Sequence, residues 1–244
     1  GAHFWMHNNF LIERSGKMSK SSGEFLRVQL LIDKGFHPLA YRLMCLQAHY
    51  RSELEFSWEG LQAAFVRLKR MVMAVSNLKA RHAELVSPSV TDVPASIVPN
   101  EPTVEADKWT LKHVQGDVAP GISAALNDFA AAVSDDLNTA IAITSLETLI
   151  GLKKVDAAQH LAAIGEMDAV LGLNLESLSR TDLRIRPKSA VITDAEIETA
   201  LTARKDARAE KDFAKSDAIR DDLIAKGVEV MDGDPLGWDW KLDI

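Results

Sequence analysis

Five of the eight prolines in this chain of 244 residues fall between Pro88 and Pro120, in a stretch that is also rich in Val, Ser, Thr and Asp. Each proline removes a backbone hydrogen-bond donor and biases the residue before it away from helical geometry. Such a stretch is typical of a linker. The sequence therefore predicts a linker over residues 84–120, which divides the chain into residues 1–83 and residues 121–244.

Helical periodicity is clearest in the first part after Ser57. Ser57 suits an N-cap, and Glu59 is placed to favour the positive end of the helix dipole. The apolar residues that follow alternate steps of four and three, which puts them on one face: Leu61, Phe65, Leu68, Val72 and Val75. We expect this stripe to pack against neighbouring helices rather than to bind a ligand.

Shorter elements are predicted on either side of that helix. Residues 4–12 are expected to form a short buried strand, and residues 24–45 carry apolar residues at helical spacing, with Pro38 starting a second helix. Ala and Leu recur at helical periods in three later ranges: 124–133, 138–152 and 157–171. Gly172 is a plausible C-cap for the last of them.

Residues 190–244 predict a small α+β unit. Thr193 and Glu196 have the spacing of a capping box, so a helix is expected to start there. Gly227 is expected to end the next helix, and residues 228–231 alternate like a strand. Two aromatic residues are expected to cover this unit: Trp238 and Trp240.

Composition limits the classes of function. The chain has 35 acidic and 28 basic residues, which argues against a broadly basic nucleic-acid coat but allows a local basic strip. Cys45 is the single cysteine, so a disulfide framework or a Cys-x-x-Cys metal site is excluded, and we interpret it as buried filler. No apolar run approaches about 18 residues, so we expect no membrane span and a reducing, cytoplasmic setting.

The sharpest local signal is the octapeptide GKMSKSSG at residues 16–23, which holds two lysines and three hydroxyl groups between glycines. Lysine is a mobile point charge that can follow phosphate oxygens as charge builds up during displacement at phosphorus. The hydroxyl groups can hydrogen-bond the same oxygens or cap the following helix. The alternative interpretation is a solvated polar turn.

Four ordered blocks resemble the cysteinyl-tRNA synthetases, a family of class I aminoacyl-tRNA synthetases. The first is KMSKS, at residues 17–21, flanked by WMHNNFL at residues 5–11. The others are AHYRSELEFS at residues 48–57, DDLNT at residues 135–139, and a charged run over residues 206–221 that is similar to the family's anticodon-binding region.

The resemblance implies ATP-dependent activation of cysteine and its transfer to tRNA(Cys). It assigns ATP binding to Lys20, supported in the same loop by Lys17, Met18, Ser19 and Ser21, with Lys17 and Lys20 as the catalytic residues. Mg²⁺ is expected to accompany ATP. The partners implied are tRNA(Cys), cysteine and ATP, and the protein is expected to be a monomer.

Two signatures of the family are missing from this sequence. The His-Ile-Gly-His nucleotide signature and the ligands of the family's Zn²⁺ ion lie before KMSKS in the family, and this chain contains neither. We therefore expect the chain to be the C-terminal half of such an enzyme, inactive alone, and we predict no metal ligands in it.

The fold class expected from pattern and resemblance together is mostly α. Residues 1–83 are expected to hold the end of a class I Rossmann catalytic domain with its stem-contact helices. Residues 121–176 are expected to form a helical-bundle (DALR-like) domain, and residues 190–244 an anticodon-binding module.

The resemblance also suggests residues for tRNA binding: Arg204, Arg208, Lys211, Phe213 and Asp217. Phe213 could stack on an unpaired base and Asp217 could accept from a base amino group. An unbroken helix would put the basic residues on one face, but Asp212 looks like an N-cap that splits it. Residues 194–226 hold seven basic and nine acidic side chains, so a solvated charged face is the alternative.

Two other functions are compatible with these patterns. The first is a cysteine ligase that uses an amino-sugar acceptor, against which the anticodon-like block argues. The second is a free-standing RNA-binding fragment without catalysis. The block at residues 49–52 (HYRS) has two interpretations. It contacts the lysine-rich loop or the tRNA backbone, or it serves only as the structural end of a helix.

Overall fold

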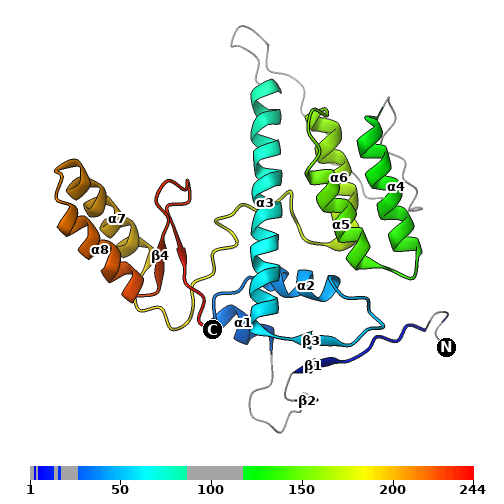
Figure 1. The fold of residues 1–244 in the computed structure, drawn as a ribbon, viewed down its shortest axis with the longest axis horizontal. Helices are drawn as coiled ribbons and strands as arrows, with labels where there is room; N and C mark the ends of the chain where they lie inside the picture. Colours follow the sequence, from blue (N-terminus) through cyan, green and yellow to red (C-terminus); the bar gives the residue numbers. More distant parts are fainter. Residues whose placement is uncertain (1–2, 4, 14–15, 18–26, 87–117) are drawn as a thin grey trace, which may run out of the picture.

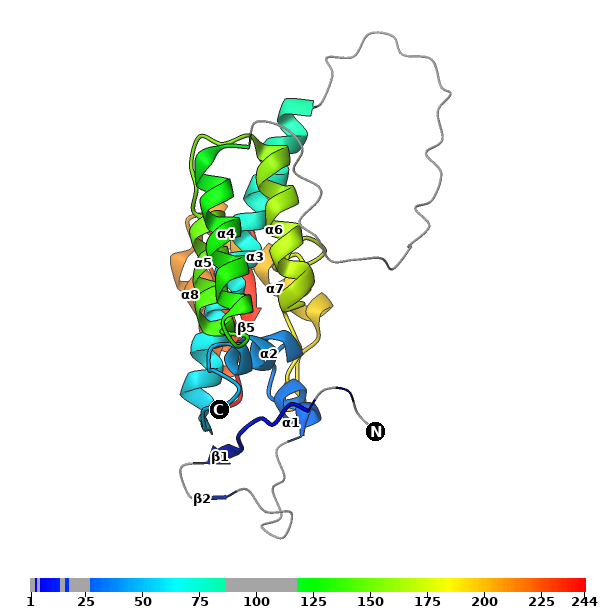
Figure 2. The ribbon, with the colours of Figure 1, turned by 90° about the vertical axis from the view of Figure 1, so that its right-hand side faces the viewer.

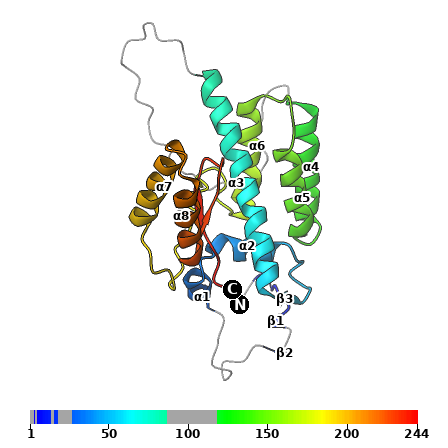
Figure 3. The ribbon, with the colours of Figure 1, turned by 60° about the vertical axis from the view of Figure 1, so that its left-hand side comes forward.

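The structure is a computed structural model that describes residue 3 and residues 5–13, 16–17, 27–86 and 118–244. Over these residues the chain is mostly helical, with eight helices and five short strands (Figure 1). The long helix α3 (Trp58–Val86) runs through the centre. Three helices lie on one side of it, and a small helical and β unit lies on the other (Figures 1 and 3).

The strands near the start of the chain form a three-stranded sheet in the order β2-β1-β3. Strand β1 (Leu11–Glu13) pairs antiparallel with β2 (Gly16–Lys17) and parallel with β3 (Leu54–Phe56). The expected buried strand over residues 4–12 is wrong for most of its length, because strand pairing begins only at Leu11. The large side chains before it are exposed: Trp5, Met6 and Phe10.

Two short helices precede α3. Helix α1 (Val28–Asp33) ends just before Gly35, whose φ of +90° turns the chain toward α2 (Pro38–Leu46). The Pro38 start is confirmed, because proline occupies the first turn of α2. The Ser57 cap is confirmed too, since its hydroxyl accepts from the Gly60 backbone N–H at 3.0 Å.

Helix α3 buries the stripe that its sequence predicts, with each of the five residues at most 2% exposed. Helices α5 (Thr139–Ile150) and α6 (Ala157–Leu171) pack against it, and α4 (Pro120–Ser134) packs on these two helices (Figure 2). Helices from both sides of the predicted linker therefore share one hydrophobic core. Most of that linker, residues 87–117, lies outside the described residues, and α3 continues to Val86.

The turn after α6 is held by a buried carboxylate. Gly172 takes a left-handed φ of +65° and ends the helix, as predicted. Asp168, which is 7% exposed, then accepts from the backbone N–H groups of Leu173 and Leu175 at 2.8 and 2.7 Å. These bonds satisfy donors that would otherwise be buried without partners.

The remaining elements build the small unit. They are α7 (Asp194–Ala209), α8 (Phe213–Ala225), β4 (Val228–Val230) and β5 (Trp238–Trp240). Thr193 and Glu196 form the predicted capping box. The strands pair antiparallel, and Trp238 and Trp240 are 1% and 4% exposed in a second hydrophobic core. Their expected role in covering this unit is confirmed.

Candidate functional site

The lysine-rich loop is only partly within the described residues. Gly16 and Lys17 form β2, with Lys17 paired opposite Ile12 of β1. The other residues that the resemblance assigns to ATP lie outside the described residues: Met18, Ser19, Lys20 and Ser21. The structure therefore gives the strand from which the loop departs.

The basic residues near the end of the chain lie on two helices rather than one. Helix α7 ends at Ala209, and the Asp212 side chain accepts from the Lys215 backbone N–H at 3.0 Å to cap α8. Lys211 lies between the helices at a φ of +63°. The N-cap interpretation of Asp212 is thus confirmed. The basic residues Arg204, Arg208, Lys211 and Lys215 therefore do not form one continuous helical stripe.

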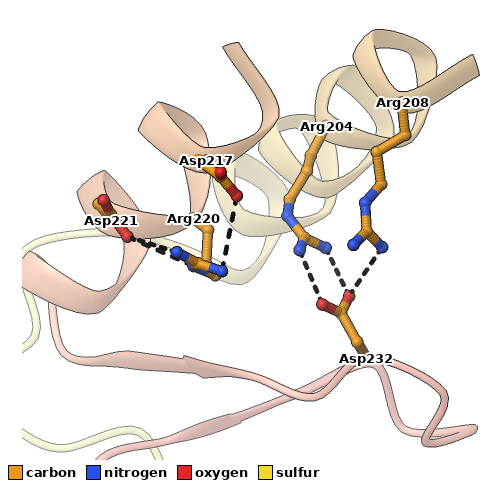
Figure 4. Close-up of polar contacts among 6 residues, drawn as sticks. All are labelled: Arg204, Arg208, Asp217, Arg220, Asp221 and Asp232. Carbon is orange, nitrogen blue, oxygen red and sulfur yellow. Dashed lines mark hydrogen bonds and ion pairs between the residues drawn. The ribbon is translucent and has the colours of Figure 1, made fainter. Parts of the chain in front are cut away.

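Arg204 and Arg208 of α7 both reach the carboxylate of Asp232, in the turn between β4 and β5 (Figure 4). Arg204 donates through both terminal nitrogens, at 2.6 and 2.8 Å, and its side chain is 6% exposed. Arg208 donates across 3.5 Å, and its side chain is 51% exposed. Arg204 is therefore held beneath the surface, while Arg208 is free to exchange a long contact for another.

The ion pair between Arg204 and Asp232 also shifts the pKa of both groups. Hydrogen bonds from Arg204 hold the pKa of Asp232 below its usual value, and those same bonds raise the pKa of the Arg204 guanidinium. Both groups are ionised at neutral pH. The pair places a carboxylate at a defined distance from the exposed Arg208.

On α8, Arg220 is shared between two carboxylates. It lies 3.5 Å from Asp217 and 3.3 Å from Asp221 (Figure 4). The Asp217 side chain is 59% exposed, so it keeps oxygen atoms available to another donor. Phe213, at the start of the same helix, is 63% exposed. An exposed aromatic ring, an exposed guanidinium and an exposed carboxylate thus lie on the surface of the α7–α8 unit.

Sequence reasoning missed a polar groove on α3. Arg67 donates to both carboxylate oxygens of Glu147 on α5, each at 2.6 Å. Beside this pair is a groove of about 660 Å³, whose other polar lining residues include Gln47, Gln62 and Arg70. No local spacing signals it, because Arg67 and Glu147 are 80 residues apart.

The remaining sequence-based expectations concern the cysteine, metal ligands and membrane-spanning helices. Cys45 is half-buried, and burial raises the pKa of its thiol. Among the described residues, no three His, Cys, Asp or Glu side chains gather as ligands for a metal ion. No helix in the described part of the chain is long and apolar enough to cross a membrane.

Comparison with protein families gives two matches. Residues 1–66 match the model of the tRNA synthetases class I (C) catalytic domain. Residues 193–235 match the model of the cysteinyl-tRNA ligase anticodon binding domain, and these residues include α7, α8 and Asp232.

Similar curated proteins carry one name. The cysteine–tRNA ligase of Novosphingobium aromaticivorans is 62% identical over 99% of this chain and 43% of its own length. That of Zymomonas mobilis is 45% identical over 99% of this chain and 47% of its own length. That of Treponema denticola is 32% identical over 94% and 44%, respectively. The chain thus spans less than half the length of these relatives.

Proposed function

We propose that this chain is part of an enzyme that activates cysteine with ATP and transfers it to tRNA(Cys). Over the residues that it shares with its relatives, the chain belongs to the cysteine–tRNA ligase family. It supplies the enzyme with tRNA-binding surfaces and with the KMSKS segment. The observation that carries this proposal is the exposure of Arg208, Phe213 and Asp217 within the residues that match the anticodon-binding model.

The proposed organisation follows the elements. The sheet β2-β1-β3 and helices α1 and α2 belong to the end of a class I catalytic domain, and the first part of the chain also supplies the stem-contact helices. Helices α4–α6 are the helical-bundle domain, which packs on α3. Residues 190–244 are the anticodon-binding module, with its own core.

In the anticodon module, each exposed group has a role that its chemistry allows. Phe213 stacks on an unpaired base, and Asp217 accepts from a base amino group. Arg208 and Lys211 donate to a base edge or a phosphate. Arg204, with its side chain 6% exposed, contributes by holding Asp232, the carboxylate that lies 3.5 Å from Arg208 until Arg208 contacts the tRNA.

At the nucleotide end, the proposal rests on the resemblance of residues 17–21. Lys17 and Lys20 stabilise the charge that develops on the α-phosphate, and Met18, Ser19 and Ser21 complete the ATP-binding loop. Mg²⁺ bound to ATP would neutralise further phosphate charge. The described residues offer no fitting set of zinc ligands, and no step of the proposal passes through zinc.

Binding of labelled tRNA(Cys) to this chain, followed by fluorescence anisotropy, tests the anticodon role. We expect Arg208→Ala to weaken binding by about 1–3 kcal/mol if Arg208 contacts a base. Lys205→Ala, which removes an exposed positive charge next to Arg204 on α7, is the matched control and should weaken binding less. Equal affinities for the two variants would remove Arg208 from the interface.

The nucleotide role needs a polypeptide that joins this chain to the remainder of a class I catalytic domain. In that protein, Lys20→Ala should abolish most cysteine-dependent pyrophosphate exchange while tRNA affinity is retained. Exchange at the unsubstituted rate would contradict the assignment. Supplying tRNA(Cys) or an amino-sugar as acceptor separates the proposed function from an amino-sugar ligase, and the anticodon-binding match supports the tRNA acceptor.

A further inference from the structure

Two sequence blocks that lie far apart in the chain meet in one polar cluster. The Tyr50 hydroxyl donates to Asp136 Oδ1 at 2.6 Å. Arg51 Nη2 donates to the same oxygen at 3.1 Å. Arg51 Nε donates to the Tyr50 hydroxyl oxygen at 2.8 Å and lies 2.8 Å from Asp136 Oδ2 in an ion pair. His49 Nε2 lies 3.0 Å from the Asp136 backbone carbonyl oxygen. The turn after α2 is thus attached to the turn between α4 and α5.

The backbone at Asp136 takes an unfavourable conformation. Asp136 and Leu137 have φ values of +52° and +56°, two successive left-handed positions without glycine. Such positions are unfavourable for residues with a Cβ atom and persist where surrounding contacts hold them. Asn138 then caps α5 by accepting from the Ile141 backbone N–H. The turn therefore presents Asp136 toward residues 49–51 at a cost in backbone energy.

Stability alone gives little reason for this arrangement. The side chains of Asp136 and Arg51 are 46% and 65% exposed. Ion pairs with that exposure contribute little to stability, because solvent screens the two charges. The exposed ion pair therefore does not offset the strain of the turn, and the geometry that the turn imposes is its main consequence.

That geometry reaches the strand that leads to the lysine loop. The Asn9 backbone N–H donates to the Tyr50 carbonyl at 2.8 Å, and its side-chain amide donates to the Arg51 carbonyl at 3.2 Å. The Leu54 N–H donates to the Phe10 carbonyl at 3.2 Å, where β3 and β1 begin to pair. Residues 50 and 51 therefore bind the helical bundle through their side chains and the β1 segment through their carbonyl groups.

We propose that Asp136 is a positioning residue. By holding Tyr50 and Arg51, it sets the position of Asn9 and β1 relative to the helical bundle. Because β2 pairs with β1, Asp136 thereby also sets the position of the strand from which the lysine loop departs. The structural part of this proposal concerns the described residues alone. Its consequence for adenylate formation rests on the proposed function.

The variant Asp136→Asn tests the structural part with little change in backbone preference, since asparagine also tolerates a left-handed φ. Asp136 Oδ1 accepts hydrogen bonds from Tyr50 and Arg51, and Oδ2 lies 2.8 Å from the donor atom Nε of Arg51. Either orientation of the amide therefore points its NH₂ group at a donor. Asp135→Asn is the matched control, because the exposed Asp135 carboxylate makes none of these contacts.

Hydrogen–deuterium exchange of this chain is the first readout. In Asp136→Asn, the amides of Asn9 and Leu54 should exchange about two- to fivefold faster, as expected for loss of an exposed charged contact. Tyr50→Phe should produce a change in the same direction. Exchange rates equal to those of Asp135→Asn would overturn the positioning role, whatever the activity.

The second readout uses the ligase completed with the remainder of its catalytic domain. Asp136→Asn should lower kcat for cysteine-dependent pyrophosphate exchange about fivefold while KM for cysteine changes less than about twofold. Faster amide exchange with unaltered kcat would overturn the proposal. Absence of pyrophosphate exchange in the unsubstituted enzyme would instead overturn the proposed function and leave the amide result as the test of positioning.

Discussion

Lys69 in α3 and Asp239 in β5 form an ion pair across 2.6 Å that joins the two hydrophobic cores of the chain. Asp239 is 5% exposed, and the Lys69 ammonium also lies 4.3 Å from the Phe65 ring centroid. Arg184 adds a second contact, with its guanidinium carbon 3.8 Å from the Trp238 ring centroid. Charged side chains of α3 and of the connector before α7 therefore both contact β5.

We expect Lys69→Met to destabilise the module by about 3 kcal/mol, because it leaves a buried carboxylate without its cation. Asp239 Oδ1 would still accept from the Trp240 backbone N–H. The measurement is urea unfolding, with amide exchange of β5 to locate the change. The double variant Lys69→Met with Asp239→Asn should recover most of the loss. A double variant that is as unstable as the sum of the singles would show that the pair is not coupled.

Replacing the exposed ring at the start of α8 should separate binding from stability. Phe213→Ala is expected to change the free energy of unfolding by less than about 0.5 kcal/mol, because the side chain is 63% exposed. It should weaken tRNA(Cys) binding by about 1–3 kcal/mol if a base stacks there. Ile224→Ala, on the same helix and 48% exposed, is the control. Equal tRNA affinities for both variants would exclude a stacking role.

His37 predicts a pH dependence of stability. Its Nδ1 accepts from the Leu39 backbone N–H to cap α2, and burial lowers its pKa, an effect that Asp182 partly opposes. The unfolded chain binds a proton more readily, so this contribution is full above about pH 6.5 and is lost as pH falls toward the folded pKa.

The test is urea unfolding at about pH 7.5 and about pH 5.5, at constant ionic strength. The wild-type chain should lose more stability between these values than His37→Asn, which keeps a capping acceptor but has no titrating ring. An identical loss in the two proteins would assign the pH dependence to other groups.

Gly172 predicts a position-specific cost for a side chain. Its φ is +65°, and an added Cβ would lie 2.8 Å from Arg42 Nη2. Arg42 Nε donates to the Leu171 carbonyl at 2.6 Å, so moving the guanidinium disturbs a hydrogen bond. Gly172→Ala should cost about 2–3 kcal/mol of unfolding free energy.

Gly233→Ala is the matched control for Gly172→Ala. Its φ is +80°, with nothing within 4 Å of an added Cβ, so it should cost only the conformational part, about 1–2 kcal/mol. Thermal unfolding of both variants measures the difference. Equal costs would mean that Arg42 moves away without loss.

The local elements were predictable because their signals lie within a few residues. Ser57, the Thr193–Glu196 pair and Gly172 act on backbone groups within one turn, so their roles follow from spacing. The failure over residues 4–12 has the opposite cause. An apolar run forms a strand only where a partner supplies hydrogen bonds, and β3 lies alongside only from Leu11 onward.

The candidate sites divide in the same way. The KMSKS letters and the charged run over residues 206–221 are local, so the family and the class of ligand were suggested by the sequence. The burial of Arg204 was not, because Asp232 lies 28 residues away and only the β4–β5 turn brings its carboxylate to α7. Nothing in the spacing distinguishes the buried Arg204 from the exposed Arg208.

The sequence by itself determined most of the helices, several of their caps and the two blocks at residues 48–57 and 135–139 that meet at Asp136. Only the tertiary structure decided that these blocks touch and that Lys69 reaches Asp239. The physical reason is that periodicity and capping depend on neighbours along the chain. The partner of a charged side chain depends on how whole helices pack.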